Sequence, residues 1–155
     1  MPGPLTANFP AVYMLVRKDN KLLFVLRSNT GFMDGFYCLP GGRVEPGEPY
    51  RAAAIREAKE EVDVTVRPEH AKQVYLQLRY KDPKDIWVDT FFEAEQWSGT
   101  PMNALPDEHG EMVWFNIDKL PAAKILDYQL SGIQDWLNGG TYGEFNWPKE
   151  SKTDD

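Results

Sequence analysis

The sequence is poor in cysteine, in positive charge and in long apolar runs, and each shortage excludes a class of protein. Cys38 is the only cysteine among 155 residues, so no disulfide can form within the chain, which fits a reducing compartment. Because it lies in the apolar stretch FYCLP, we expect a thiol buried by packing and not a nucleophile. With 17 Lys and Arg against 24 Asp and Glu, the net charge is −7. Binding to a nucleic-acid polymer is therefore not expected, because it requires a basic face that displaces phosphate counterions.

Long apolar segments are missing as well. No run approaches the roughly 18 residues of a membrane-spanning helix, and the opening MPGPLTANFP lacks the charged and apolar regions of a signal peptide. We therefore expect a soluble, cytoplasmic protein with no membrane partner. The 155 residues, 42% of them hydrophobic, are enough for one buried core and few for two domains. We expect a single domain over residues 1–155, with its core at about 10–138 and a disordered tail at 148–155.

The order of segments predicts two hairpins and two helices. The hairpin strands are predicted at 11–17 and 21–27, and at 73–79 and 87–94. An apolar run at 36–39 ends where Pro40-Gly41-Gly42 forces a change of direction. The helical patterns cover 49–62, with Pro49 at the first position, and 125–137. Residues 97–110 are predicted as a loop, followed by a strand at 112–116.

The first predicted helix carries a cluster of carboxylates. At 100° per residue, its apolar stripe is formed by Ile55, Ala58 and Val62, and its opposite face by Glu57, Glu60 and Glu61. One interpretation is a solvated surface with the core behind it. However, Glu57 and Glu61 are like charges one turn apart, which is unfavourable unless a cation lies between them. Oxygen ligands without a nearby His or Cys favour Mg²⁺, Mn²⁺ or Ca²⁺ over zinc.

A divalent ion held by a few carboxylates usually takes its remaining ligands from water and from substrate phosphates. An acidic protein can bind an anion in this way. The metal polarises a phosphoryl oxygen and lowers the pKa of a bound water, whose proton a spare carboxylate can accept. Arg56 lies one turn from Glu60, so it either forms an exposed ion pair or orients a working carboxylate. Composition leaves both roles open.

Residues 41–64, GGRVEPGEPYRAAAIREAKEEVDV, resemble the Nudix box of the MutT-like Nudix hydrolases. The pattern is Gly, five residues, Glu, seven residues, Arg-Glu, an aliphatic, any residue, Glu-Glu, any residue, Gly and an aliphatic. The matching positions are Gly42, Glu48, Arg56, Glu57, Ala58, Glu60, Glu61, Asp63 and Val64. Two positions depart from the pattern: Ala58 is smaller than the usual aliphatic, and Asp63 replaces the glycine. Asp63 is expected in a left-handed conformation just after the helix, which Asp tolerates better than most residues.

The resemblance implies an α+β Nudix fold, a mixed sheet sandwiched between helices. It implies metal ligands at the backbone carbonyl of Gly41 and at the carboxylates of Glu57, Glu60 and Glu61. Glu48 resembles a residue that supports the metal site through another ligand or through a bound water, and Arg56 the residue that orients the carboxylates. The general base differs among members of the family, and we place it on Glu60 or Glu61. From its position before Trp114, Glu108 is expected to reach the same metal site from a loop, although a solvated acidic turn is an equal alternative.

The implied reaction is Mg²⁺-dependent hydrolysis of a nucleoside diphosphate linked to another group, with Mn²⁺ able to substitute. The length of the chain and the loop before Trp114 most resemble small members that convert nucleoside triphosphates, including oxidised ones, to the monophosphate and pyrophosphate. Lys124 stands where some members have an Asn that reads an oxidised guanine, so base recognition does not carry over. Aromatics that suit either base stacking or the core are Phe32, Phe36, Tyr37 and Trp87. Two alternatives remain: an ADP-ribose or dinucleotide pyrophosphatase, and a nucleotide sensor without turnover.

Overall fold

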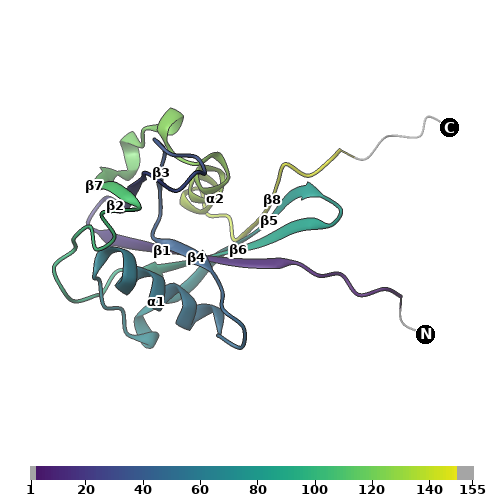
Figure 1. Cartoon of the computed structure of the whole chain (residues 1–155), viewed down its shortest axis with the longest axis horizontal. Helices are drawn as coiled ribbons and strands as arrows, with labels where there is room; N and C mark the ends of the chain where they lie inside the picture. The colour runs from purple at the N-terminus through teal and green to yellow at the C-terminus, as the bar shows by residue number, and fades with distance from the viewer. Residues whose placement is uncertain (1–2, 150–155) are drawn as a thin grey trace.

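The computed structural model describes residues 3–149 and contains eight strands and two α-helices (Figure 1). The strands are β1 (Phe9–Lys18), β2 (Lys21–Arg27), β3 (Tyr37–Cys38), β4 (Gly41–Arg43), β5 (Lys72–Asp82), β6 (Asp85–Ala94), β7 (His109–Asn116) and β8 (Tyr142–Phe145). The helices are α1 (Tyr50–Val62) and α2 (Asp127–Leu137). Three short 3₁₀ turns lie at Pro68–His70, Ile117–Lys119 and Ala122–Lys124.

Strand β1 organises the sheet because it pairs with three other strands. It runs parallel to β6 from Phe9 to Val16, antiparallel to β4 over 11–13, and antiparallel to β2 at its end. The strand order is β3-β2-β1-β6-β5-β8, and β4 and β7 pair with β1 and β2 off this path. The sheet is therefore mixed, and β4, which opens the Nudix-like segment, lies beside its central strand.

The two faces of the sheet are both buried, each beneath one helix. Alternate side chains of β1 divide between two apolar clusters: Val12, Met14 and Val16 face the cluster that contains α1, while Tyr13 and Leu15 face the one packed against α2. This is the alternation expected of a strand covered on both sides. In Figure 1, α1 lies below the sheet and α2 above it. The predicted α+β arrangement, a mixed sheet between helices, is confirmed.

Both predicted hairpins are present, as β1–β2 and β5–β6. Helix α1 begins at Tyr50, so Pro49 is the residue before the helix and not its first position. Cys38 is buried, and burial raises the pKa of its thiol to about 12, which agrees with a packing role. Asp63 has φ 55° and ψ 35°, the left-handed conformation predicted for it.

Two strands are not predicted from the sequence, and the predicted start of a third is wrong. β4 was assigned to a turn, since two glycines and a proline are poor strand formers. β8 was not predicted; it is four residues long and pairs in parallel with β5. β7 begins at His109, inside the segment predicted as a loop, because His109 pairs with Arg27 across a bulge in β2. These assignments depend on pairing partners distant in sequence.

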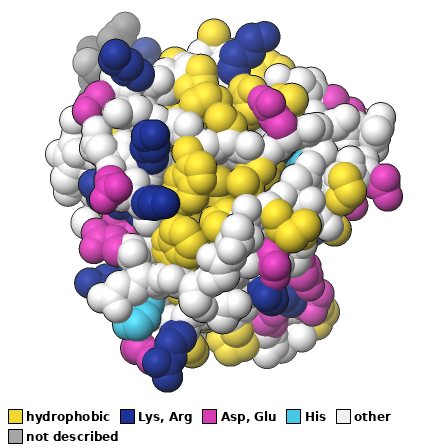
Figure 2. All heavy atoms as spheres, turned by 90° about the vertical axis from the view of Figure 1, so that its left-hand side faces the viewer, with side chains coloured by type: hydrophobic (Ala, Val, Ile, Leu, Met, Phe, Trp, Pro, Cys, Tyr) yellow, Lys and Arg dark blue, Asp and Glu magenta, His cyan; other side chains and the backbone are white. Residues whose placement is uncertain are grey.

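No helix within residues 3–149 is long and apolar enough to cross a membrane. Most of the tail predicted as disordered, residues 150–155, lies outside the described residues. The face on the side of β2 and β7 is partly apolar: Figure 2 shows a band of apolar side chains across its middle, with Lys and Arg along one side. Partly buried aromatic residues such as Trp97 and Trp114, stacked with ring centroids 6.0 Å apart, also pack against the cluster that contains α1. The core thus extends toward the surface through aromatic side chains.

Candidate active site

Two adjacent glycines in β4 bring the backbone against the carboxylates of α1. The Gly41 N–H donates to Glu61 Oε2 at 3.1 Å. Because the N–H and C=O of one strand residue point toward the same edge, the Gly41 carbonyl points to the edge of β4 on which this N–H meets Glu61. A Cβ on Gly42 would lie 2.8 Å from Glu57 Oε1, and one on Gly41 would lie 2.2 Å from the Val12 carbonyl oxygen. Glycine is therefore required at Gly41 for the sheet and at Gly42 for the approach of Glu57.

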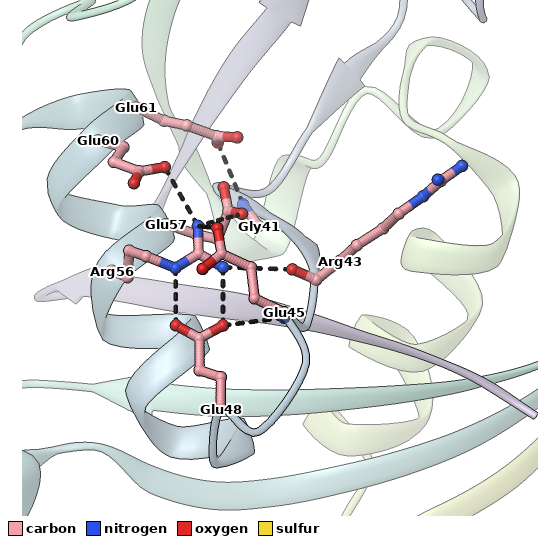
Figure 3. Close-up of polar contacts among 8 residues, drawn as sticks. All are labelled: Gly41, Arg43, Glu45, Glu48, Arg56, Glu57, Glu60 and Glu61. Carbon is pink, nitrogen blue, oxygen red and sulfur yellow. Dashed lines mark hydrogen bonds and ion pairs between the residues drawn. The ribbon is translucent and has the colours of Figure 1, made fainter.

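Arg56 holds three of the carboxylates together (Figure 3). Its Nε and Nη2 donate to the two oxygens of Glu48 at 2.7 and 2.9 Å, a bidentate pair. Its Nη1 donates to Glu57 at 3.0 Å and to Glu60 at 3.2 Å. A further bond from Nη2 to the Arg43 carbonyl, at 3.3 Å, ties the same side chain to β4. Arg56 thus makes the ion pair considered from the sequence and also fixes the orientation of Glu57.

The carboxylates differ in their electrostatic surroundings. The Arg56 guanidinium lowers the pKa of Glu48. Burial raises the pKa of Glu57, with Arg56 opposing the change. For Glu61, burial and then the neighbouring Glu57 carboxylate raise the pKa well above its usual range, and Glu108 adds to the effect. Negative charge is therefore least compensated by protein groups around Glu61.

Glu60 is set apart from the other two glutamates of the helix. Its side chain is 53% exposed, whereas that of Glu57 is 13% exposed. Figure 3 shows its carboxylate turned toward Arg56. Within residues 3–149, no three His, Cys, Asp or Glu side chains stand close enough to hold a metal ion as they lie. A shared ion would require Glu60 to turn away from Arg56, which its exposure permits.

The loop before β7 is docked onto the end of α1, and this places Glu108. The Met102 N–H donates to the Val62 carbonyl and the Ala104 N–H to the Glu61 carbonyl, each at 3.0 Å. These bonds satisfy carbonyls that a helix end leaves without partners. Glu108 follows in an exposed turn, near enough to influence the pKa of Glu61. The loop carboxylate and the helix carboxylate are thus neighbours although they are 47 positions apart in the sequence.

A cavity of about 450 Å³ opens beside Glu61. Its wall includes Gly41 and Gly42, and four cationic side chains, those of Arg27, Arg43, Arg79 and Lys81. The sequence does not predict these cations as neighbours, because they come from three strands, β2, β4 and β5, whose proximity depends on the sheet. Figure 3 shows the Arg43 side chain pointing away from the carboxylate cluster. The wall of the cavity is therefore acidic at Glu61 and basic at the four cationic side chains.

Of the four aromatic residues considered for base stacking, Phe32 and Trp87 line this cavity. Phe36 and Tyr37 pack instead against the two apolar clusters. Phe32 is presented by a loop in which Arg27 donates to its carbonyl at 2.8 Å and lies 5.4 Å from its ring. Of the four, Phe32 and Trp87 therefore remain available to contact a ligand in the cavity.

The donor set suits a hard divalent cation. The groups that converge near Glu61 are carboxylate oxygens and a backbone carbonyl, which are ligands preferred by Mg²⁺ and Mn²⁺. The crowding of Glu57 and Glu61, with Arg56 already committed to Glu48, leaves negative charge that a cation would compensate. The residues present therefore fit a metal of this class.

Comparison with known proteins agrees with this geometry. The family model of the NUDIX domain matches residues 7–135. The chain belongs to the Nudix family. It is 30% identical over 115 residues to the 8-oxo-dGTP diphosphatase of Escherichia coli, a match covering 73% of this chain and 87% of that protein. It is also 30% identical over 131 residues to the ADP-ribose pyrophosphatase of Methanocaldococcus jannaschii, covering 83% and 75%.

The solved structures include a similar MutT NUDIX hydrolase from Burkholderia pseudomallei. Its TM-score to this chain is 0.73 at 25% sequence identity, over 83% of this chain and 97% of that one. The protein is thus a MutT-like Nudix hydrolase with the reaction class of a pyrophosphohydrolase. Nudix substrates are small nucleotide-type molecules, and the family typically uses a divalent metal. Because the chain is an enzyme, the alternative of a sensor without turnover is not retained.

Proposed function

We propose that this Nudix hydrolase converts nucleoside triphosphates, oxidised ones included, to the monophosphate and pyrophosphate with Mg²⁺, for which Mn²⁺ can substitute. The observation that carries the proposal is the position of Glu61. It lies against Gly41 and beside Glu57, in the wall of a cavity whose other charged side chains are cationic. A polyphosphate can thus meet a metal site at one end of the cavity and cations along it.

The metal would be held by the Gly41 carbonyl and by Glu57, Glu60 and Glu61, with Glu108 added from the loop. When bound, the metal supplies Lewis-acid polarisation of a phosphoryl oxygen and lowers the pKa of a coordinated water. Glu48 acts on the metal site indirectly, through its bidentate pair with Arg56 or through a bridging water.

The protein's own groups position the reactants and move the proton. Arg56 fixes the rotamer of Glu57, so that less conformational freedom is lost when the site forms. In the reaction, the water oxygen bonds to phosphorus, the P–O bond of the pyrophosphate link breaks, and the water proton passes to a glutamate. We assign this base to Glu61 or Glu60; Glu61 lines the cavity, which supports the first. The displaced oxygen leaves on pyrophosphate or on the nucleoside monophosphate, according to which phosphorus is attacked, and its negative charge lies near the cations of the cavity.

The relatives support two different candidate substrates. Similarity to the Escherichia coli 8-oxo-dGTP diphosphatase favours a nucleoside triphosphate. Similarity to the Methanocaldococcus jannaschii ADP-ribose pyrophosphatase makes ADP-ribose the second candidate. Three cations of the cavity wall, Arg27, Arg43 and Lys81, suit the larger negative charge of a triphosphate.

The decisive experiment is a substrate panel with product analysis. The common nucleoside triphosphates, 8-oxo-dGTP and ADP-ribose are incubated with Mg²⁺, with Mn²⁺ or with EDTA, and products are separated by anion exchange. We expect monophosphate and pyrophosphate from triphosphates, and none in EDTA. Glu61→Gln should lower turnover by orders of magnitude, whereas the matched control Glu69→Gln, on a separate 3₁₀ turn, should not. Full turnover in EDTA would refute the proposal.

A further inference from the structure

A buried ion pair between Arg79 and Asp89 lies at the cavity, away from α1 and its carboxylates. Asp89 of β6 is 0% exposed, and Arg79 of β5 is 7% exposed. Arg79 donates from Nε to Asp89 Oδ2 at 2.8 Å and from Nη2 to Oδ1 at 3.1 Å. The Tyr13 hydroxyl donates to Asp89 Oδ1 at 3.1 Å, and Gln77 Nε2 lies 3.5 Å from Oδ2. The carboxylate is therefore saturated, and it fixes the plane of the guanidinium.

Two aromatic rings lie close to the Arg79 guanidinium and restrict its orientation. Its guanidinium carbon lies 3.9 Å from the centroid of Tyr128 and 5.0 Å from that of Trp87. The two bonds to Asp89 use Nε and Nη2, so Nη1 takes no part in the pair, and Arg79 lines the cavity. A buried ion pair adds little stability over an apolar pair of similar volume, because desolvating two charges is costly. Its value here lies in holding a rigid donor at the cavity.

Gln129 of α2 supplies a second donor to the same cavity. It is 3% exposed, and its side chain accepts the Leu39 N–H at 2.7 Å. Because a backbone N–H can only donate, the accepting atom is Oε1 and the amide nitrogen Nε2 lies on the other side. Gln129 lines the cavity, and Nε2 is not among the buried atoms without a partner within residues 3–149. Since Nε2 also makes no hydrogen bond to another residue of the described part of the chain, this nitrogen is accessible and can donate to a ligand in the cavity.

We propose that Arg79 and Gln129 select nucleotides with a keto base, guanine or uracil, over those with an amino base, adenine or cytosine. The inference rests on the proposed function, because it places the base of the same substrate in this cavity. Both protein groups can only donate. Guanine offers a carbonyl acceptor at O6 and uracil one at O4, whereas adenine and cytosine present amino donors at the corresponding positions, N6 and N4; N7 is an acceptor in both purines and does not distinguish them. An amino group facing Arg79 would leave donors opposed in a desolvated site, which is costly.

Base selection can be measured without hydrolysis. The affinities of GMP, UMP, AMP and CMP for the full chain are determined by isothermal titration calorimetry, with ribose 5-phosphate as the probe that lacks a base. We expect GMP to bind about tenfold more tightly than AMP, and UMP about tenfold more tightly than CMP, since a good Arg contact to a base discriminates by this order. Ribose 5-phosphate should bind more weakly than GMP.

Gln129→Glu is the discriminating variant because it retains the acceptor for Leu39 and replaces the donor by an oxygen. It should reduce the GMP to AMP preference about tenfold, while Gln134→Glu, an exposed position on the same helix, should leave it unchanged. Arg79→Lys should also reduce the preference, since it retains the charge beside Asp89 but loses the planar fork. If Arg79→Lys fails to fold, the base preference of Gln129→Glu alone decides whether the inference holds.

Equal affinities for the four monophosphates, or a preference for AMP and CMP, would overturn the inference. So would equal effects of the two glutamate variants, or binding of ribose 5-phosphate as tight as that of GMP. A separate assay of triphosphate hydrolysis distinguishes the two proposals. Selective binding of GMP without turnover of any triphosphate contradicts the proposed function alone, and turnover without base selectivity contradicts only the inference.

Discussion

The end of α1 offers a test of backbone strain next to the carboxylates. Asp63 terminates the helix with φ 55°, and its N–H donates to the Lys59 carbonyl at 3.1 Å, the 5→1 bond of an αL motif. Asp63 also forms an exposed ion pair with Lys59, with Nζ and Oδ1 2.5 Å apart. We expect Asp63→Gly to be neutral or mildly stabilising and Asp63→Val to be clearly destabilising.

The magnitudes follow from three contributions. A left-handed residue with a side chain costs roughly 1–2 kcal/mol relative to glycine, and a β-branched residue lies at the upper end. Glycine regains this strain energy but loses about 0.4–1 kcal/mol because the unfolded chain becomes more flexible. Both variants lose the exposed pair with Lys59, about 0.3–0.5 kcal/mol. The glycine variant should therefore exceed the valine variant in stability by about 1–2 kcal/mol.

Differential scanning calorimetry measures the difference. For a chain of this size, roughly 2–4 °C of Tm corresponds to 1 kcal/mol, so we expect the glycine variant to melt about 2–8 °C above the valine variant. Asp63→Asn is the control, because Asn tolerates the left-handed region and removes only the charge. It should fall within about 1–2 °C of the unaltered protein. Indistinguishable Tm values for the glycine and valine variants would refute the assignment of strain.

Three further predictions concern the site. Mg²⁺ should raise the Tm of the unaltered protein, and Glu61→Gln should abolish this rise. The same substitution should raise the Tm without metal, because Gln lacks the charge that Glu61 carries in a desolvated position beside Glu57. A rise in Tm with Mg²⁺ that persists in the variant would contradict a metal site here. Gly41→Ala should prevent folding, or lower stability by about 3 kcal/mol or more, because the new Cβ meets the backbone oxygen of Val12. Gly42→Ala, whose Cβ meets only the end of the Glu57 side chain and no backbone atom, should fold and weaken Mg²⁺ binding; equal circular-dichroism melting curves for the two alanine variants would count against this account. Glu108→Gln should lower turnover at saturating substrate or shift the Mg²⁺ dependence, and an unchanged Mg²⁺ titration of activity would assign the residue to the surface.

The features predicted correctly are those encoded by local spacing. The helix at α1, its apolar stripe and the grouping of Glu57 with Glu61 follow from the helical period, which needs no knowledge of the rest of the fold. The left-handed Asp63 follows from its place just after that helix. Even here the predicted solvent face was only partly right. Glu57 is largely buried, because β4 packs beside the helix and its glycines allow the approach.

The features that were missed depend on the register of the sheet. Arg79 and Asp89 occupy separate strands, and the β5–β6 pairing, with Leu78 opposite Val88 and Gln77 opposite Asp89, brings them together. A shift of one residue would send Asp89 to the other face of the sheet. Neither residue stands in a motif that would mark it in advance. The only sequence signal is an Asp within an otherwise apolar strand, WVDTFF, which predicts a buried partner without saying which residue it is.

The net charge and the local charge of this chain lead to different conclusions about partners, and the structure explains why both hold. A net charge of −7 disfavours association with a long polyanion, because such binding sums contacts over an extended surface. The cations of the cavity, by contrast, come from β2, β4 and β5 and converge on one small volume. Fields within a cleft are focused by its low-dielectric walls, so a few cations there outweigh a larger number of carboxylates spread over the surface. A single compact anion that reaches both the cations and a metal at Glu61 is therefore the ligand that this distribution of charge favours.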